Sequence, residues 1–403
     1  MCRTSLSKGR KKCGLWHRHW LKALCYVRSV LPTRFCCARA AGAFMLSHTV
    51  KTINACDSVF VTGPARSGTE LVRGMLNRHH AVHLAAETHY FDDLRPRLGT
   101  RAVAGLEGKD RIHAVAYFRA LRHRAYGLAG DPEAADWPHA LLDEEARALG
   151  GGADAIFEAY CRLCASDVGK KIWGEKTPRH VYRIDEIFGS FPNAHVVVVL
   201  RDVRGVIASY RDWRNRWFEG QVLSDELAAA VAAEEGRAAA TYSLTLNTLL
   251  WCSAVRTALR MARCHGPDRV SILRFEDVLL NPAATAKALC DRIGVPFDPA
   301  MLEAGVVNSS YTGNRANQGF DITVSERWRE RLSIAERRHV DLVAGRIMAE
   351  LGYDRDRLGV AIRASSWEFT KTAIALFRAL AHNRERIANP LEYIRTRAAA
   401  LFK

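Results

Sequence analysis

No stretch of this 403-residue sequence contains 18 consecutive apolar residues. A helix that crosses a bilayer needs about 20 such residues, so we expect no membrane-spanning helix. The N-terminal region does not fit a secretory signal either, because Arg34 and Arg39 interrupt its apolar part. We therefore expect a cytoplasmic protein, with peripheral attachment to a membrane as the alternative.

Acidic residues are missing from the N-terminal region, since residues 1–51 contain 11 Lys and Arg but no Asp or Glu. Residues 359–403 hold 8 basic and 3 acidic residues, whereas residues 52–358 hold 40 of each. The net charge of +16 therefore belongs to the two ends, and a nucleic-acid-binding core is not indicated. We expect residues 1–56 to be a basic tail rich in Cys and Trp without fixed structure. Contact with an anionic membrane is the alternative for this tail.

A second cysteine pair with metal-ligand spacing is also missing. The sequence contains 11 cysteines, and the pair Cys161 and Cys164 stands without a partner pair. A structural zinc site needs four ligands, so we predict no zinc and interpret the cysteines as free thiols in a reducing compartment. Internal repeats are absent as well, and we interpret residues 57–358 as one domain.

Short β-branched runs alternate with helical patterns through this domain. We predict strands at 58–62, 195–200 and 269–273, where the second contains four consecutive valines typical of a strand buried on both faces. Helices follow each strand, and the last begins at Asn281-Pro282 and ends at Gly294. This alternation predicts an α/β fold with a parallel sheet between helices. Residues 359–403 predict two basic amphipathic helices that are separated near Pro390.

The turn after the first strand has the glycine spacing of a phosphate-binding loop, in the sequence VTGPARSGTELV at 61–72. Gly63 and Gly68 let successive N–H groups face one anion, and the following helix adds its positive N-terminus. A nucleoside-triphosphate loop carries a lysine after the second glycine, but Thr69 stands there. Arg66 is the cation available within the loop, and its guanidinium can clamp two oxygens of a phosphate or sulfate. This composition predicts an anion that is bound without a metal.

A second set of anion-binding residues follows the valine-rich strand, in the sequence LRDVRGVIASY. Arg201 lies at the carboxyl end of this strand, where parallel α/β sheets bind their ligands. Ser209 follows two helical turns later, so its hydroxyl can face the same anion. A salt bridge from Arg201 to Asp202 or Glu186 is the structural alternative.

Together these stretches resemble the sulfotransferases that use 3′-phosphoadenosine 5′-phosphosulfate (PAPS), in a style close to the protein-tyrosine and Golgi-type enzymes. Two further segments are similar to that family, WGEKTPRHVYRIDEIF and LRFEDVLLNPAATAKALCDRIGVPFDPAML. The resemblance covers about residues 57–353 and implies a P-loop-like fold. It also implies that the 5′-phosphosulfate is surrounded by loop residues Arg66, Ser67, Gly68 and Thr69, beside Glu70. It further places the 3′-phosphate on Arg201 and Ser209, with PAPS as co-substrate and no metal.

Sulfuryl transfer to a hydroxyl group requires a base for the acceptor proton. The resemblance implies that Glu87, in AAETHYF, is this base, and His89 is the alternative on the same face of an extended segment. His83 is a weaker candidate. Lys176, in GEKTPRH, is predicted to reach a sulfate oxygen and the bridging oxygen, while Arg66 neutralises charge on the leaving group.

Three questions stay open at this level. Glu70 replaces the Thr or Ser that is usual in the family, so it either points to solvent or repels the cofactor. Because of this substitution, a non-catalytic scaffold protein is an alternative. A small-molecule kinase is a further alternative, but the sequence lacks the lysine and the metal-binding carboxylate that a kinase needs. The acceptor is a glycan, a protein tyrosine or a small molecule, and we favour a glycan. Ser309, Ser310 and Trp328 resemble late family positions.

Overall fold

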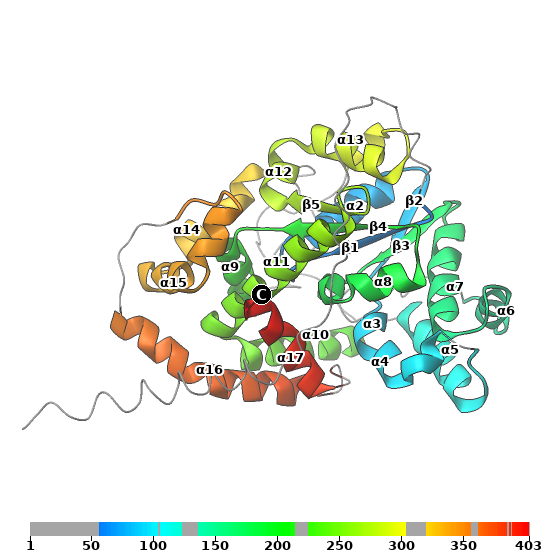
Figure 1. Cartoon of the computed structure of the whole chain (residues 1–403), viewed down its shortest axis with the longest axis horizontal. Coiled ribbons are helices and arrows are strands. Elements are labelled where there is room, and N and C mark those ends of the chain that lie inside the picture. The colour runs from blue at the N-terminus through cyan, green and yellow to red at the C-terminus, as the bar shows by residue number, and fades with distance from the viewer. Residues whose placement is uncertain are drawn as a thin grey trace, which may run out of the picture. The chain divides into compact units, whose positions relative to one another are not determined.

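Five short segments form one parallel β-sheet in the computed structural model (Figure 1). The structure describes residues 56–103, 105–122, 136–213, 225–303, 320–355, 362–384, 387 and 389–402. The strand order is β2-β3-β1-β4-β5, and every neighbouring pair is parallel. The strands are β1 (Ser58–Thr62), β2 (Val82–Ala85), β3 (Ile172–Lys176), β4 (Ala194–Leu200) and β5 (Val270–Arg274).

The side chains of β4 alternate between two hydrophobic cores. Val196, Val198 and Leu200 belong to one core, whereas Val197 and Val199 belong to the other. Both faces of the central strands are therefore covered, which explains the unbroken run of valines. The predicted α/β fold with a parallel sheet between helices is confirmed.

Helices cover the two faces of the sheet unequally. In Figure 1, α12 and α13 lie above the strands and α8 lies below them. The smaller core is formed with α2 (Thr69–Arg78), α12 (Phe275–Leu280) and α13 (Pro282–Ile293). The larger core involves α5 (Gly108–Arg122), α6 (Leu141–Ala148), α7 (Ala153–Ser166), α8 (Ile184–Ser190), α9 (Val203–Trp213), α11 (Leu244–His265) and α15 (Ile334–Glu350).

The remaining elements are mostly short. They are α3 (Tyr90–Asp93), α4 (Arg95–Leu98), α10 (Asp225–Thr241), α14 (Trp328–Arg331), α16 (Ile362–His382), α17 (Pro390–Phe402) and the 3₁₀ turns η1 (Gly99–Ala102), η3 (Pro178–Tyr182), η4 (Pro299–Glu303) and η5 (Ile322–Ser325). The predicted helix from Pro282 is present, and Gly294 ends it in the left-handed conformation that glycine adopts without strain. The six cysteines that the structure describes are free thiols, as predicted.

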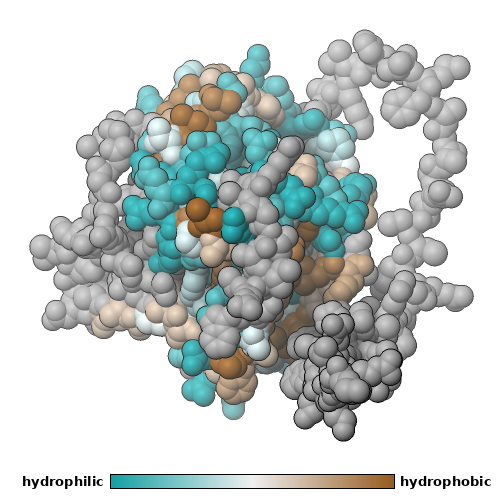
Figure 2. Space-filling view, turned by 90° about the vertical axis from the view of Figure 1, so that its left-hand side faces the viewer, coloured by the Kyte–Doolittle hydropathy of each residue, from teal (hydrophilic) through white to brown (hydrophobic). Residues whose placement is uncertain are grey.

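Two helices follow residue 361, as the sequence predicts, and the second begins at Pro390. Helix α17 is held on the domain by an ion pair between Arg183 and Glu392 at 3.0 Å. Helix α16 exposes Ile374 and Phe377, with 58% and 74% of these residues accessible. In Figure 2, hydrophobic residues form separate areas among hydrophilic ones on the face that is shown. Within the described ranges, no helix has the length and apolarity needed to span a bilayer.

His195 on β4 predicts a loss of stability in acid. Its ring is buried between the Asp268 carbonyl oxygen at 3.1 Å and Ser271 Oγ at 2.9 Å, and burial lowers its pKa to about 4. The unfolded chain takes up this proton below about pH 6.5, whereas the folded chain resists it, so stability falls with falling pH. The unaltered protein should lose about 2 kcal/mol of unfolding free energy between pH 7 and pH 5 because of His195. The variant His195→Gln should not show this part of the loss.

Urea unfolding followed by tryptophan fluorescence at both pH values measures this effect. The matched control is His113→Gln, because His113 is exposed on α5. The control variant should lose as much stability in acid as the unaltered protein. An equal loss in His195→Gln as well would contradict the assignment.

Candidate functional site

Three adjacent strands deliver their carboxyl ends to one edge of the sheet. Strand β3 ends at Lys176, β1 leads into the glycine loop, and β4 ends just before Arg201. Strand β1 lies between the other two, and its Val61 pairs with Lys176 in register. Segments that are more than 100 residues apart in sequence therefore meet at the edge where α/β sheets bind ligands.

The loop between β1 and α2 is formed by backbone conformations that few residues adopt. Gly63 and Gly68 have φ of +142° and +90°, and Arg66 has a φ of +68°. A Cβ at Gly68 would lie 2.2 Å from the Phe275 ring, and one at Gly63 would lie 2.3 Å from the Val199 carbonyl oxygen. A non-glycine residue held at positive φ costs free energy and marks functional loops. Arg66 is such a residue.

The start of α2 has the donors of an anion site. Gly68 is the N-cap of α2, and no side chain accepts a hydrogen bond there. The first N–H groups of a helix lack partners within the helix and carry its positive dipole end. Ser67 Oγ is buried in the loop and has no hydrogen-bond partner among the described residues. Thr69 is buried beside it.

The two stretches that the sequence assigns to one ligand are in direct contact. Arg66 Nε donates a hydrogen bond to Ser209 Oγ at 3.0 Å, across 143 residues of sequence. Arg201 Nη1 donates to the carbonyl oxygen of Arg66 at 3.3 Å. The candidate 5′-phosphosulfate loop and the candidate 3′-phosphate residues thus form one continuous group.

Arg201 does not form the salt bridges of the structural alternative. Asp202 pairs with Arg204 at 2.6 Å, and Glu186 pairs with two other arginines. The guanidinium of Arg201 is buried over the Phe275 ring, 4.5 Å from its centre, and its Nε has no partner among the described residues. Its Nη1 and Nη2 donate to the carbonyl oxygens of Arg66 and Val324. A buried donor without a partner is costly, and a bound anion would supply a partner for Nε.

Lys176 joins two carboxylates at the same edge. Its Nζ lies 2.6 Å from Glu87 Oε1 and 3.0 Å from Glu70 Oε2, and its side chain is only 4% exposed. Burial alone would lower the pKa of Lys176, but Glu87 and Glu70 outweigh burial and raise it. Burial would raise the pKa of Glu87, yet the charge of Lys176 holds it far below its usual value. Lys176 is therefore charged and Glu87 is ionised at neutral pH.

His89 supports Glu87 at the second carboxylate oxygen. His89 Nε2 lies 3.2 Å from Glu87 Oε2, and burial, with the charge of Arg179, lowers the pKa of His89. A neutral His89 therefore donates from Nε2 to Glu87. His83 lies on β2, where burial lowers its pKa to about 4, and the structure gives it no contact with Glu87. The geometry brings Glu87 and His89 together with Lys176, and it leaves His83 apart.

Glu70 does not point to solvent, so the first of its two alternatives is wrong and the inward orientation remains. Its side chain is 15% exposed and lies between Lys176 and Arg73. Arg73 donates to Glu70 Oε1 from Nε at 2.9 Å and from Nη2 at 2.5 Å. Burial would raise the pKa of Glu70, but the charges of Lys176 and Arg73 hold it below its usual value. Lys176 and Arg73 therefore keep the Glu70 carboxylate ionised inside the site.

A second buried carboxylate fixes the segment around Glu87, and the sequence analysis missed it. Glu175 Oε2 accepts hydrogen bonds from the Thr88 backbone N–H at 3.2 Å and from Thr177 Oγ1 at 2.7 Å. Its other oxygen lies 2.5 Å from His180 Nδ1. Because Thr88 follows Glu87 directly, this network positions the backbone of the candidate base.

Tyr210 also escaped the sequence analysis, although it follows Ser209 on α9. Burial raises the pKa of Tyr210 to about 12; the charge of Arg66 opposes this, and Tyr393 and Glu87 add to it. These influences reach Tyr210 from the loop, from the candidate base and from helix α17. A hydrophobic residue in a helix gives no local signal of such a position.

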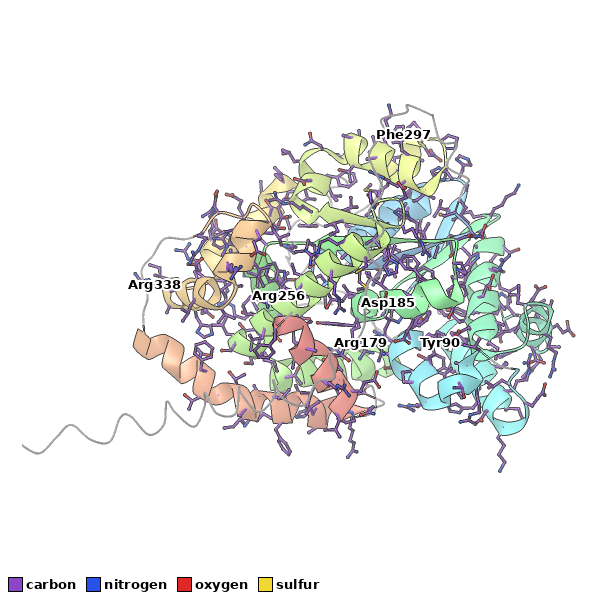
Figure 3. All side chains as sticks on the ribbon, in the orientation of Figure 1. Tyr90, Arg179, Asp185, Arg256, Phe297 and Arg338 are labelled. Atoms are coloured by element: carbon purple, nitrogen blue, oxygen red, sulfur yellow. The ribbon has the colours of Figure 1, made fainter. Side chains whose placement is uncertain are left out.

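Arg179 connects the same region to α3 and α17, between which it lies in Figure 3. Its Nη2 donates to Asp93 Oδ1 at 3.0 Å. Burial would lower the pKa of Arg179, but Asp92, Asp93 and Tyr393 outweigh it. The ring of Tyr393 is covered by the guanidinium of Arg397 at 3.4 Å. Arg179 is therefore joined to α3 by an ion pair with Asp93.

The candidate residues late in the sequence, Ser309, Ser310 and Trp328, add nothing to the described site. Trp328 is 2% exposed, and the guanidinium of Arg204 lies 3.9 Å from the centre of one of its rings, so it packs the interior. Ser309 and Ser310 lie outside the described residues, as does the basic tail at 1–55.

Comparison with known proteins adds a family to this geometry. A sequence model of the sulfotransferase family matches residues 58–299. Nodulation protein NoeE of Sinorhizobium fredii (strain NBRC 101917 / NGR234) is 27% identical over 214 residues, which are 50% of this chain and 48% of that protein. The match thus spans about half the length of that curated relative.

Two solved structures are similar to the chain over about three quarters of its length. The sulfotransferase domain from the Synechococcus PCC 7002 olefin synthase is 20% identical, with a TM-score of 0.44, and 75% of this chain and 97% of that chain are covered. The sulfotransferase from Alicyclobacillus acidocaldarius is 15% identical, with a TM-score of 0.37 and coverage of 76% and 99%.

Proposed function

Because the chain belongs to the sulfotransferase family, we propose that it transfers a sulfuryl group from PAPS to a hydroxyl acceptor. The observation that carries this proposal is the junction of Arg66 with Ser209 and Arg201 at the sheet edge. This junction brings the hydrogen-bond donors proposed for the 5′-phosphosulfate of PAPS next to those proposed for its 3′-phosphate. Residues 57–358 form the catalytic domain in this proposal, and 359–403 form an extension.

The cofactor residues follow from the loop geometry. The N–H groups at the start of α2, with Ser67, Gly68 and Thr69, hold the 5′-phosphosulfate. The unpartnered Nε of Arg201 and the hydroxyl of Ser209 face the 3′-phosphate. Arg66 lies between the two groups and stabilises negative charge that develops on the leaving phosphate.

The transfer itself uses Glu87 and Lys176. The acceptor oxygen forms a bond to sulfur as the bond from sulfur to the bridging oxygen of PAPS breaks. The acceptor proton passes to the carboxylate of Glu87, and the electron pair of the broken bond stays on 3′-phosphoadenosine 5′-phosphate (PAP). Lys176 donates to the oxygen that gains this charge. His89 keeps Glu87 oriented through its hydrogen bond to Oε2.

We expect PAP to raise the melting temperature of the protein without any magnesium. A ligand that binds only the folded state stabilises by about 2.7 kcal/mol at 100 times its Kd. The shift should persist in excess EDTA, because Arg66 and Lys176 supply the positive charge in this proposal. Thermal denaturation with PAP, with EDTA and with ATP plus magnesium measures the difference.

The three ligand conditions separate the alternatives. A kinase needs ATP and magnesium for stabilisation, and PAP would leave it unchanged. A scaffold without turnover would bind PAP but would not consume PAPS. Absence of any PAP shift would contradict the proposed function.

The acceptor is the finer part of the proposal, and we favour a glycan. This preference rests on the motif style, because many enzymes with this style of motif modify glycans. Incubation of the protein with labelled PAPS and fractionated lysate, followed by mass spectrometry, identifies the acceptor. Label on protein tyrosine or on a small phenol would overturn the glycan assignment while retaining the reaction.

A further inference from the structure

Lys176 is held by two carboxylates, and one of them has no role in the proposed reaction. Glu87 and Glu70 approach Nζ from separate segments, at 2.6 Å and 3.0 Å. Glu87 lies two residues beyond β2, whereas Glu70 lies in the first turn of α2. An ammonium group has three N–H donors, so two are directed at carboxylates and a third remains for a sulfuryl or bridging oxygen.

We infer that Glu70 is a positioning residue that keeps Lys176 Nζ aimed at the cofactor when Glu87 takes up the acceptor proton. This inference rests on the proposed sulfuryl transfer. Glu87 loses its negative charge in that step, and its attraction for Lys176 falls with it. Glu70 then remains as the carboxylate within contact of Nζ among the described residues. A buried ammonium without a counter-charge would be costly, so the second carboxylate prevents its displacement.

Arg73 makes Glu70 a rigid partner. Its two nitrogens contact Glu70 Oε1, and Nη1 donates to the carbonyl oxygen of Leu84 on β2 at 3.2 Å. The carboxylate is thereby fixed to the strand that leads to Glu87, and Oε2 is left for Lys176. If Glu70 only balanced the charge of Lys176, the hydrogen bond from Arg73 to Leu84 on β2 would not be needed.

The same carboxylate should weaken cofactor binding. Glu70 follows Thr69 directly at the start of α2, where the phosphosulfate is proposed to bind, and like charges at such range repel. A threonine or serine at this position would bind the anion more tightly but would leave Lys176 with one carboxylate. With Glu instead of Thr or Ser at position 70, the protein binds the cofactor more weakly but holds Lys176 Nζ in a fixed position.

We expect Glu70→Gln to bind PAP about 3- to 10-fold more tightly and to transfer sulfate about 10-fold more slowly. Isothermal titration calorimetry gives the PAP affinity, and labelled PAPS with the acceptor fraction gives kcat. The matched control is Glu350→Gln, because Glu350 pairs with Arg346 on the exposed surface of α15. A merely structural role would weaken binding and turnover together, whereas this role moves them in opposite directions.

A double-mutant cycle with Lys176→Met tests the route of the effect. If Glu70 acts through the lysine, Glu70→Gln should no longer slow transfer in the Lys176→Met background. An unchanged tenfold loss there, or a PAP affinity of Glu70→Gln equal to that of the unaltered protein, would overturn the inference alone. Failure of the unaltered protein to bind PAP would instead overturn the proposed function on which it rests.

Discussion

Replacement of Glu87 by Gln is expected to lower sulfuryl transfer by about 100-fold or more and to leave PAP affinity within about twofold. The amide retains the shape of the carboxylate but cannot accept the acceptor proton. PAP affinity should change little, because Glu87 contacts Lys176 and His89 rather than the loop that holds the cofactor. Single-turnover transfer from labelled PAPS measures the rate, and calorimetry with PAP measures the affinity.

His89→Asn is the companion variant, since His89 is the alternative base. We expect it to reduce transfer by about 10-fold, because it removes the hydrogen bond that orients Glu87 and not the proton acceptor itself. Full transfer in Glu87→Gln together with a loss in His89→Asn would reassign the base. The geometry argues for the donor role, because Glu87 Oε2 lies 3.2 Å from His89 Nε2 and an ionised carboxylate oxygen only accepts.

Local patterns predicted three of the five strands and the α/β class, but β2 and β3 were missed. The valines of β4 and the glycine loop carry signals within a few residues, and both were predicted. Strand β3 was missed because Gly174, Glu175 and Lys176 look like a loop in sequence. Pairing with β1 and β2 on either side imposes the strand, and Thr88 and Thr177 donate hydrogen bonds to Oε2 of its buried carboxylate.

Some contacts of the candidate site could likewise be predicted from the sequence, and others could not. The contact between Arg66 and Ser209 was predictable, because the ends of neighbouring parallel strands share one edge. The contact between Lys176 and Glu70 was not, since 106 residues separate them and no periodic pattern connects them. Arg73 offered a usable signal, because it stands three residues after Glu70 on one helix face.

Arg201→Ala is expected to weaken PAP binding by about 1.5–3 kcal/mol, or roughly 10- to 150-fold, the range for hydrogen bonds to a charged group. Arg201 is buried at the end of β4, and its Nε has no partner among the described residues. Its loss removes the donor that we assign to the 3′-phosphate. Calorimetric titration of both proteins with PAP measures the change.

A structural explanation exists for the same loss, because Arg201 also donates to the carbonyl oxygen of Arg66 and could support the loop. Titration with 5′-AMP, which lacks the 3′-phosphate, separates the two explanations. If Arg201 binds the 3′-phosphate, the variant should lose PAP affinity, keep its affinity for 5′-AMP within about twofold, and no longer prefer PAP. Equal weakening of both ligands would show that Arg201 acts on the Arg66 loop, and the 3′-phosphate would then need another partner.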